Sequence, residues 1–225
     1  MIADLLPAEV SAEDILGFDP DAELLPEEES LVAKAVQKRR LEVTNVRTAA
    51  RRALAKIGVP AVPILHGKKG EPLWPAGIVG SLTHTGGYCA AAVADAGKIR
   101  SIGIDAEEHD RLPEGVLDVV SLPEERVMLQ RLGTSQHWDR LLFSAKESVY
   151  KAWFPLTGRW LGFEDARITI DPDNAAFTVR ILIDGTVTDD GPPLTGFTGR
   201  YLVRDGYVLT AITVLPPEIT SGSPS

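Results

Sequence analysis

One segment of the chain carries a carboxylate and two ammonium groups at helical spacing. Apolar residues recur every three or four positions from residue 138 to residue 153, which predicts a buried amphipathic helix. Glu147 and Lys151 lie four residues apart on the face opposite the apolar stripe, with Lys146 at the edge of that face. An exposed Glu–Lys pair alone stabilises a helix by only about 0.3–0.5 kcal/mol. Whether this pair does chemistry therefore depends on which groups the fold brings to it.

Two further carboxylates follow an apolar, β-branched run at residues 99–104. Asp105 and Glu107 are two residues apart, so both side chains point to the same side of the predicted strand. Neighbouring acids repel each other unless a cation lies between them, and oxygen ligands of this kind suit Mg²⁺ or Mn²⁺. Glu147 is the natural third carboxylate from another element. The Asp-x-Glu pattern alone is weak evidence, because many such pairs belong to exposed turns.

Charge is segregated along the first third of the chain. Residues 1–33 contain ten acidic and no basic side chains, whereas residues 34–69 contain ten Lys or Arg and one acid. A concentrated basic segment in a chain of net charge −9 indicates a local anion site more than a track for a polyanion. Chance surface composition produces such segregation about as often, so other phosphate-binding features must accompany it.

Two helices are predicted in this region, over residues 26–40 and 44–57, the second ended by Gly58. Their arginines include Arg39, Arg40, Arg47 and Arg51. Arg47 and Arg51 are four residues apart and therefore share a helical face. Converging guanidinium groups favour phosphate, because each planar fork binds two oxygens.

Two glycine-containing segments add further donors for an anion. A loop near residue 70 carries Lys68 and Lys69 but lacks the pattern of a P-loop, and alone it predicts only a surface turn. Residues 80–87 place Thr83 and His84 beside paired glycines, where hydroxyl, ring and backbone N–H groups are available to a phosphate. A lone histidine is more often structural, so His84 depends on its neighbours for a functional interpretation.

Composition limits the class of protein. The chain has 225 residues and a mass of 24.3 kDa, with 44% hydrophobic and 24% charged residues, as in an ordinary globular protein. The single cysteine, Cys89, excludes an internal disulfide and a cysteine-based zinc site. No apolar run reaches about 18 residues, and no basic region precedes an apolar stretch at the N-terminus. We therefore expect a cytoplasmic protein without a membrane span.

The remaining segments read as an α+β protein. Residues 1–26 predict an irregular acidic lead-in, residues 88–94 a strand of small residues, and residues 122–133 a helix. Three β-rich runs follow, at residues 166–170, 176–183 and 199–214, the last a hairpin that turns at Asp205-Gly206. Residues 216–225 are rich in Pro and Ser and predict a mobile tail.

Four motifs in this order resemble those of the 4′-phosphopantetheinyl transferases. Residues 103–107 and 143–151 meet the family pattern GxDxE followed, about forty residues later, by [WF]xxKExxxK. Residues 70–75 and 81–84 are similar to its two upstream motifs. The resemblance covers roughly residues 35–215 and is strongest to the enterobactin-synthetase-component subgroup, the surfactin-type group II enzymes, especially their actinobacterial members.

The resemblance implies two similar halves in one monomeric chain, each a small antiparallel sheet packed with a long helix. The halves would comprise residues 1–103 and 104–215, with coenzyme A in the cleft between them and residues 216–225 as a flexible tail. It also implies the reaction, in which 4′-phosphopantetheine moves from coenzyme A to a serine of an acyl or peptidyl carrier protein. Adenosine 3′,5′-bisphosphate would be released.

The family motifs assign roles to five charged residues. Asp105, Glu107 and Glu147 match the Mg²⁺ ligands, and Glu147 would also serve as the base for the carrier serine. Lys151 matches the lysine that contacts the pyrophosphate and assists the leaving group. Lys146 would contact the same phosphates.

The upstream motifs imply the phosphate contacts of coenzyme A. Arg47, Thr83 and His84 match residues that hold the adenosine phosphates, and Arg39 would assist them. The chain departs from the family at Glu71, where some members have a lysine. Lys68 or Lys69 would then supply that contact, and we expect Lys69.

Ala106, at the middle of the GxDxE motif, implies a water in the metal sphere at that position. Two other classes of function remain open from the residues alone. A Mg²⁺-dependent nucleotide phosphohydrolase would use the same acids and bases without an acceptor protein. A nucleic-acid module would use residues 39–56, although the net charge of −9 argues against nucleic acid as a partner. Among carriers, those of polyketide, nonribosomal-peptide or siderophore synthases are expected, with fatty-acid carriers as an alternative.

Overall fold

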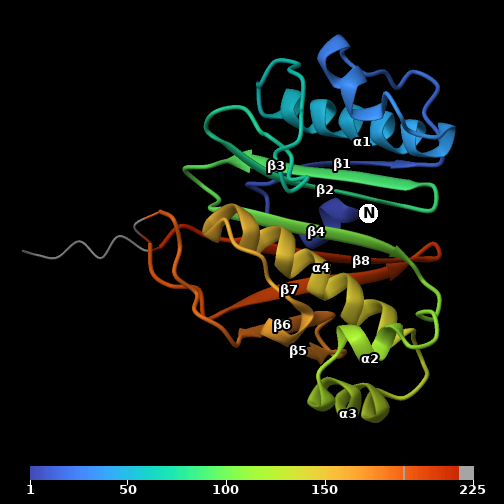
Figure 1. The fold of residues 1–225 in the computed structure, drawn as a ribbon, viewed down its shortest axis with the longest axis vertical. Helices are drawn as coiled ribbons and strands as arrows, with labels where there is room; N and C mark the ends of the chain where they lie inside the picture. The colour runs from blue at the N-terminus through green and yellow to red at the C-terminus, as the bar shows by residue number, and fades with distance from the viewer. Residues whose placement is uncertain (190, 218–225) are drawn as a thin grey trace, which may run out of the picture.

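The computed structural model describes residues 1–189 and 191–217 and shows two antiparallel sheets side by side, each packed with one long helix (Figure 1). One sheet has the strand order β1-β3-β2 and the other β4-β8-β7-β6-β5. Helix α1 packs on the first sheet and α4 on the second. The predicted α+β class with two similar halves is confirmed. Within the described residues, no helix has the length and apolar character needed to cross a membrane.

The first sheet is built around a strand of small residues. Its strands are β1 (Ser11–Leu16), β2 (Ile78–Thr85) and β3 (Tyr88–Asp95). Alternate residues of β3 face opposite ways, so Ala91 packs with Ala49 and Ala53 of α1 (Gln37–Lys56), whereas Ala90 and Ala92 pack toward the second sheet. Both faces of β3 are therefore buried, and its alanines permit close approach on either side.

The N-terminal region differs from its prediction in two respects. A 3₁₀ helix, Pro26–Val32, precedes a single helix α1 that continues through residues 41–44, where two helices were expected. No Gly or Pro interrupts α1 before Gly58, which has φ +77°, so its buried stripe is continuous. The acidic lead-in is also not irregular throughout, because residues 11–16 form β1 and pair with residues 88–93 of β3. Its acids obscured the strand pattern.

The second sheet contains β4 (Ser101–Glu108), β5 (Ala166–Asp171), β6 (Ala176–Ile181), β7 (Gly196–Arg204) and β8 (Tyr207–Val214). Asp205 and Gly206 both have positive φ between β7 and β8, which confirms the predicted hairpin turn. Helices α2 (Val116–Val120), α3 (Pro123–Leu132) and α4 (Trp138–Thr157) cover one face together with a short 3₁₀ turn, Phe163–Asp165. Another 3₁₀ turn, Ile2–Leu5, packs near β7 and β8.

The two sheets meet where β2 lies beside β4, and side chains rather than a backbone ladder join them. The backbone N–H of Ile104 donates to Ser81 Oγ at 3.1 Å, and that of Ala106 donates to Thr83 Oγ1 at 3.0 Å. The boundary predicted at residues 103–104 falls inside β4. From residue 218 onward, the predicted tail at 216–225 lies outside the described residues.

Gly103 is required for α4 to lie on β4. A Cβ at this position would lie 1.9 Å from Ser148 O and 2.8 Å from Ala152 N, both backbone atoms of α4. Backbone atoms of a packed helix cannot move aside individually, so any larger residue separates helix and strand.

We expect Gly103→Ala to destabilise the protein by about 3 kcal/mol, because it overpacks this contact. Urea unfolding measures the loss. Gly97→Ala is a matched control, because the Cβ there would meet only a side-chain oxygen, Asp95 Oδ1, at 3.2 Å. Equal stability of the two variants would contradict the close contact of α4 with β4.

Candidate active site

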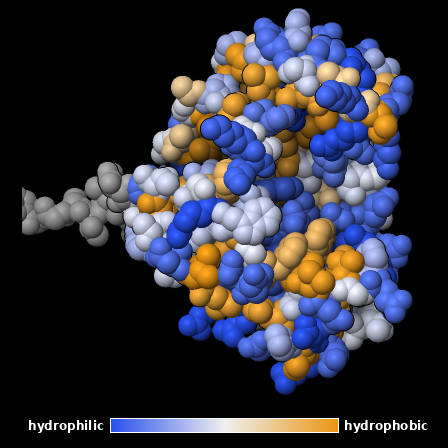
Figure 2. All heavy atoms as spheres, viewed as in Figure 1, coloured by the Kyte–Doolittle hydropathy of each residue, from blue (hydrophilic) through white to orange (hydrophobic). Residues whose placement is uncertain are grey.

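A cavity of about 1020 Å³ lies between the two halves and is lined by residues from α1, β2, β4 and α4. Figure 2 shows hydrophilic residues gathered where the halves meet on this face. Two predicted site residues, Glu107 and Lys146, do not line the cavity. The other eight do: Arg39, Arg47, Lys69, Thr83, His84, Asp105, Glu147 and Lys151. The fold therefore brings segments more than 100 residues apart in sequence into one site.

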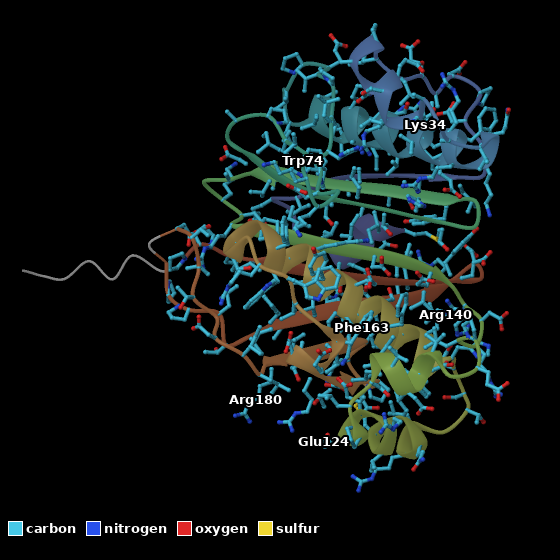
Figure 3. All side chains as sticks on the ribbon, in the orientation of Figure 1. Lys34, Trp74, Glu124, Arg140, Phe163 and Arg180 are labelled. Carbon is cyan, nitrogen blue, oxygen red and sulfur yellow. The ribbon has the colours of Figure 1, made fainter. Side chains whose placement is uncertain are left out.

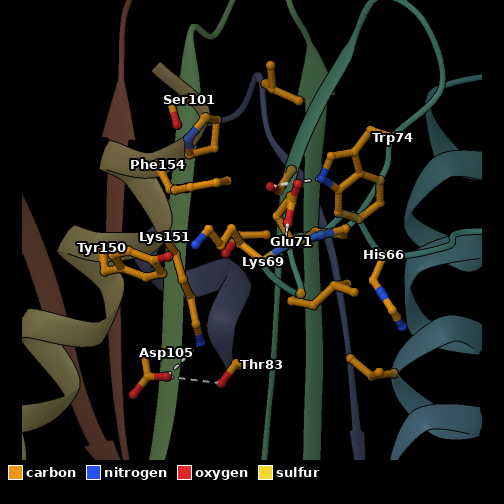
Figure 4. A pocket seen from close by; sticks show the side chains of 18 of the residues that line it. His66, Lys69, Glu71, Trp74, Thr83, Ser101, Asp105, Tyr150, Lys151 and Phe154 are labelled. Carbon is orange, nitrogen blue, oxygen red and sulfur yellow. Dashed lines mark hydrogen bonds and ion pairs between the residues drawn. The ribbon is translucent and has the colours of Figure 1, made fainter. Parts of the chain in front are cut away.

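Asp105 is the buried centre of this site. The ammonium group of Lys151 donates hydrogen bonds to Asp105 Oδ1 at 2.8 Å and to Ile104 O at 3.0 Å. Thr83 Oγ1 also donates to Asp105 Oδ1, at 3.3 Å (Figure 4). Asp105 Oδ2 is buried without a hydrogen-bond partner among residues 1–189 and 191–217. A buried carboxylate oxygen in that state is costly unless another group satisfies it.

Two more carboxylates lie within electrostatic reach of Asp105. Burial first, and the charge of Asp105 second, raise the pKa of Glu107 to about 7. Arg140, whose Nη1 donates to Glu107 Oε2 at 3.0 Å, opposes this rise. Burial also raises the pKa of Glu147, again with Asp105 contributing and Lys151 opposing. The charge of Asp105 thus penalises the ionisation of both glutamates, which favours a cation among the three acids.

A closed metal centre is not formed in this arrangement. Within the described parts of the chain, no three His, Cys, Asp or Glu side chains are grouped closely enough to hold a metal ion. Lys151 instead supplies the positive charge beside Asp105. The unsatisfied oxygen of Asp105 and the mutual repulsion of the acids nevertheless fit a divalent cation, for which carboxylate oxygens are the preferred ligands.

Cationic and neutral donors line the α1 side of the cavity. Arg39 contacts His84 Nε2 through its guanidinium group, and both side chains lie near Glu42. Burial lowers the pKa of His84, and the positive charge of Arg39 lowers it further, so the ring is neutral at pH 7. Arg47 is buried and donates Nε to Ile64 O at 2.7 Å, which leaves its Nη groups without a partner in the described residues. Burial lowers the pKa of Arg47 to about 10, so it stays charged.

The loop that carries Lys69 is fixed beside β2. Trp74 donates its ring N–H to Gly80 O at 3.0 Å, and Glu71 Oε2 accepts the backbone N–H of Lys69 at 2.9 Å. Lys69 and Glu71 both line the cavity, whereas Lys68 does not. Figure 4 shows the labelled Lys69 and Glu71 together on the Trp74 side of the cavity.

The structure does not bring Lys146 to the cavity. Its ammonium group is buried and contacts Glu125 Oε2 at 2.8 Å, Phe163 O at 2.6 Å and Ala166 O at 3.0 Å. Glu125 also accepts the N–H of Ile168 at 2.7 Å. Lys146 therefore ties α4 to α3 and β5, and the expected contact with the pyrophosphate is not supported. The edge position that the helical pattern gave it faces the neighbouring elements.

Acidic side chains of residues 1–33 neutralise much of the basic segment, residues 34–69. Ion pairs join the two regions at four places: Glu29 with Arg40, Glu28 with Arg51, Asp19 with Arg52 and Glu13 with Lys56. Arg51 therefore does not converge with Arg47 on an anion, since its partner Glu28 is fully buried. Arg39 and Arg47 are the arginines of α1 that line the cavity, so the anion site is smaller than the charge pattern implied.

Sequence reasoning missed two kinds of site residue. Tyr150 and Phe154, four residues apart on α4, line the cavity with ring centroids 5.8 Å apart and provide an apolar wall. Arg140 pairs with Glu107. The spacing of seven and four residues among Arg140, Glu147 and Lys151 places all three on one face of a helix and was a usable signal.

The cavity, its paired halves and its acid–base content define a class of protein. Residues 27–94 match the family model of the 4′-phosphopantetheinyl transferase N-terminal domain, and residues 101–201 match that of the 4′-phosphopantetheinyl transferase superfamily. The chain belongs to the 4′-phosphopantetheinyl transferase superfamily.

Curated relatives match over nearly the whole chain. The chain is 52% identical over 219 residues to the 4′-phosphopantetheinyl transferase Npt of Nocardia iowensis, covering 94% of this chain and 99% of that protein. It is 53% identical over 223 residues to PptT of Mycobacterium tuberculosis, covering 95% and 98%. Enterobactin synthase component D of Salmonella typhi is 37% identical over 142 residues, or 60% of this chain and 56% of that protein.

We expect Lys146→Met to act on stability and not on ligand binding. Loss of the ammonium group leaves Glu125 buried without its counter-charge, which costs about 3–5 kcal/mol. Urea unfolding should show this loss of stability, whereas the folded variant should keep the wild-type KM for coenzyme A. The double variant Lys146→Met/Glu125→Leu should recover stability. A raised KM for coenzyme A in fully folded Lys146→Met would show that Lys146 contributes to cofactor binding and would contradict this prediction.

The pKa of Glu107 predicts a pH dependence in the metal-free protein. Because burial raises this pKa to about 7, the folded state binds a proton that the unfolded state loses near pH 4.5. The contribution of Glu107 to stability is therefore largest at low pH and falls as pH rises through about 5 to 8. Relative to Glu107→Gln, the wild type should lose about 2–3 kcal/mol over this range. Parallel stability profiles of the two proteins would contradict the shift.

Proposed function

We propose that this protein transfers 4′-phosphopantetheine from coenzyme A to a serine hydroxyl of a carrier protein and releases adenosine 3′,5′-bisphosphate. One observation carries the proposal: a single cavity joins Asp105, Glu147 and Lys151 at one side to Arg39, Arg47 and His84 at the other, and Glu107 follows Asp105 on the same side of β4. A cofactor with a pyrophosphate and a third phosphate fits that division, since it needs cations at two places. Family membership supports the same reaction.

Asp105, Glu107 and Glu147 would hold Mg²⁺, with Mn²⁺ as the alternative ion. The unsatisfied Oδ2 of Asp105 and the mutual repulsion of the three acids support this assignment. When bound, the ion would neutralise negative charge on the pyrophosphate of coenzyme A. Ala106 supplies no ligand: its side chain is buried in the hydrophobic core, on the side of β4 opposite Asp105 and Glu107, so the water expected at this position is not supported.

Glu147 would take the proton from the acceptor serine. Its burial and the nearby charge of Asp105 raise its pKa, and a carboxylate with a raised pKa is a better base near neutral pH. Lys151, one helical turn further along α4, would contact the pyrophosphate and stabilise the departing phosphate. Its ammonium group donates to Ile104 O and Asp105 Oδ1, so a third N–H remains for the phosphate.

The donors on the α1 side would bind the adenosine phosphates. Arg47 has free Nη groups facing the cavity, and neutral His84 donates without adding to the repulsion from Arg39. Thr83 would assist, although its hydroxyl already bridges Asp105 and Ala106. Some members of the family have a lysine at the position of Glu71 that contacts the cofactor. In this chain, Lys69 would supply that contact.

The acceptors would be carrier proteins of polyketide, nonribosomal-peptide or siderophore synthases, including synthases that make antibiotics. The reaction would take place in the cytoplasm. A nucleic-acid function is disfavoured because acids of the lead-in neutralise Arg40, Arg51, Arg52 and Lys56. Coenzyme A hydrolysis without an acceptor is the alternative that the same cavity permits.

The transfer can be tested with purified protein, Mg²⁺, coenzyme A and a panel of apo carrier proteins. Mass spectrometry should show a modified carrier and an equimolar amount of adenosine 3′,5′-bisphosphate. Glu147→Gln should lower kcat at least about 100-fold, because it removes the base. Glu124→Gln, an exposed carboxylate on α3, is the matched control and should behave as wild type. Nucleotide release without carrier modification would identify a hydrolase instead.

A further inference from the structure

Arg140 lies in the first turn of α4, on the helical face that also carries Glu147 and Lys151 (Figure 3). Its side chain is only 16% exposed. The family motif on α4 begins at residue 143 and assigns no role to Arg140. Its position nevertheless brings it against Glu107, the last acid of the GxDxE motif.

Every nitrogen of the Arg140 guanidinium group has a partner. Nη1 donates to Glu107 Oε2, Nε to Asp110 O and Nη2 to Arg111 O, each at 3.0 Å. The two carbonyl contacts hold the planar group in one orientation, and the third contact transmits that orientation to Glu107. Lysine could not do this, because its ammonium group is a point charge without a fixed plane.

The contact determines which oxygen of Glu107 is available. Arg140 engages Oε2 and leaves Oε1 without a hydrogen-bond partner in the described residues. Asp105 and Glu107 project from the same side of β4, so the free oxygen belongs to the group of acids around Asp105. Lys151 holds Asp105 from the same helix at 2.8 Å. Helix α4 thus pairs one cation with Asp105 and one with Glu107.

We propose that Arg140 is a positioning residue for the metal site: it holds Glu107 so that Oε1 faces Asp105 and Glu147. The proposal rests on the proposed function, because it assigns Arg140 to the same site. Carboxylates that bind metals commonly accept a hydrogen bond from an outer residue, and loss of that residue typically weakens metal binding 10–100-fold. Arg140 does not line the cavity, so it would contact neither the metal nor the cofactor.

Arg159 offers a matched control. It also donates to one carboxylate, Asp184 Oδ2 at 3.2 Å, and to two backbone carbonyls, Asp184 O at 2.7 Å and Thr186 O at 2.8 Å. It is remote from Glu107 and does not line the cavity. Replacement of either arginine removes the same kinds of contact, so effects on general folding appear in both variants.

The experiment compares wild type, Arg140→Met, Arg140→Lys and Arg159→Met. Calorimetric titration of Mg²⁺ into each protein saturated with coenzyme A gives the metal affinity without any turnover. Arg140→Met should weaken Mg²⁺ binding at least about tenfold, and Arg140→Lys should restore only part of it. Arg159→Met should bind Mg²⁺ as wild type does. At saturating Mg²⁺, the KM for coenzyme A should stay within about twofold in all four proteins.

A second background tests whether Arg140 acts through Glu107. In Glu107→Gln, the further change Arg140→Met should cause no additional loss of Mg²⁺ affinity, because the oriented carboxylate is already gone. Mg²⁺ affinity of Arg140→Met that equals or exceeds wild type, or a full additional loss in Glu107→Gln, would overturn the proposal while wild-type transfer activity remains. Failure of wild type to bind Mg²⁺ and coenzyme A or to modify any carrier would instead overturn the proposed function, and this proposal with it.

Discussion

The close contact between α4 and β4 at Gly103 determines where the charged groups of the cavity lie. Because α4 lies directly on the strand, Lys151 reaches Asp105 and Arg140 reaches Glu107 from one helix. A bulkier residue at 103 would lift the helix and lengthen both contacts. The first glycine of the GxDxE motif therefore serves the acids that follow it, although it contributes no polar atom.

Burial and charge act together on this site. Glu107 and Glu147 lie where water is scarce, so the charge of Asp105 raises the cost of their ionisation, and nearby cations only partly offset it. On the opposite side of the cavity, ion pairs with the lead-in remove most of the positive charge of α1 but spare Arg39 and Arg47. The result is a cavity that is electrostatically incomplete on both sides, although the surrounding protein is well neutralised.

The sequence predicted the elements whose signals are local. The amphipathic pattern of α4 and the Asp205-Gly206 turn depend on neighbouring residues, and both are confirmed. The motif residues could be grouped because four patterns occur in order. Other features depend on distant partners: β1 exists because β3 pairs with it, and Lys146 is buried because Glu125 meets it. Helical spacing predicts which way a side chain points on its helix, but it does not identify the element against which that side chain packs.

The hydroxyl contacts between β2 and β4 have a consequence for solubility. Both strands lie at an edge of their own sheet, and an unpaired edge can recruit strands from other molecules. Ser81 and Thr83 occupy the outward N–H groups of Ile104 and Ala106, while each sheet keeps its own register. Two short side chains therefore protect the edges of β2 and β4 against aggregation without joining the two sheets into one. The cavity lies along this junction between β2 and β4.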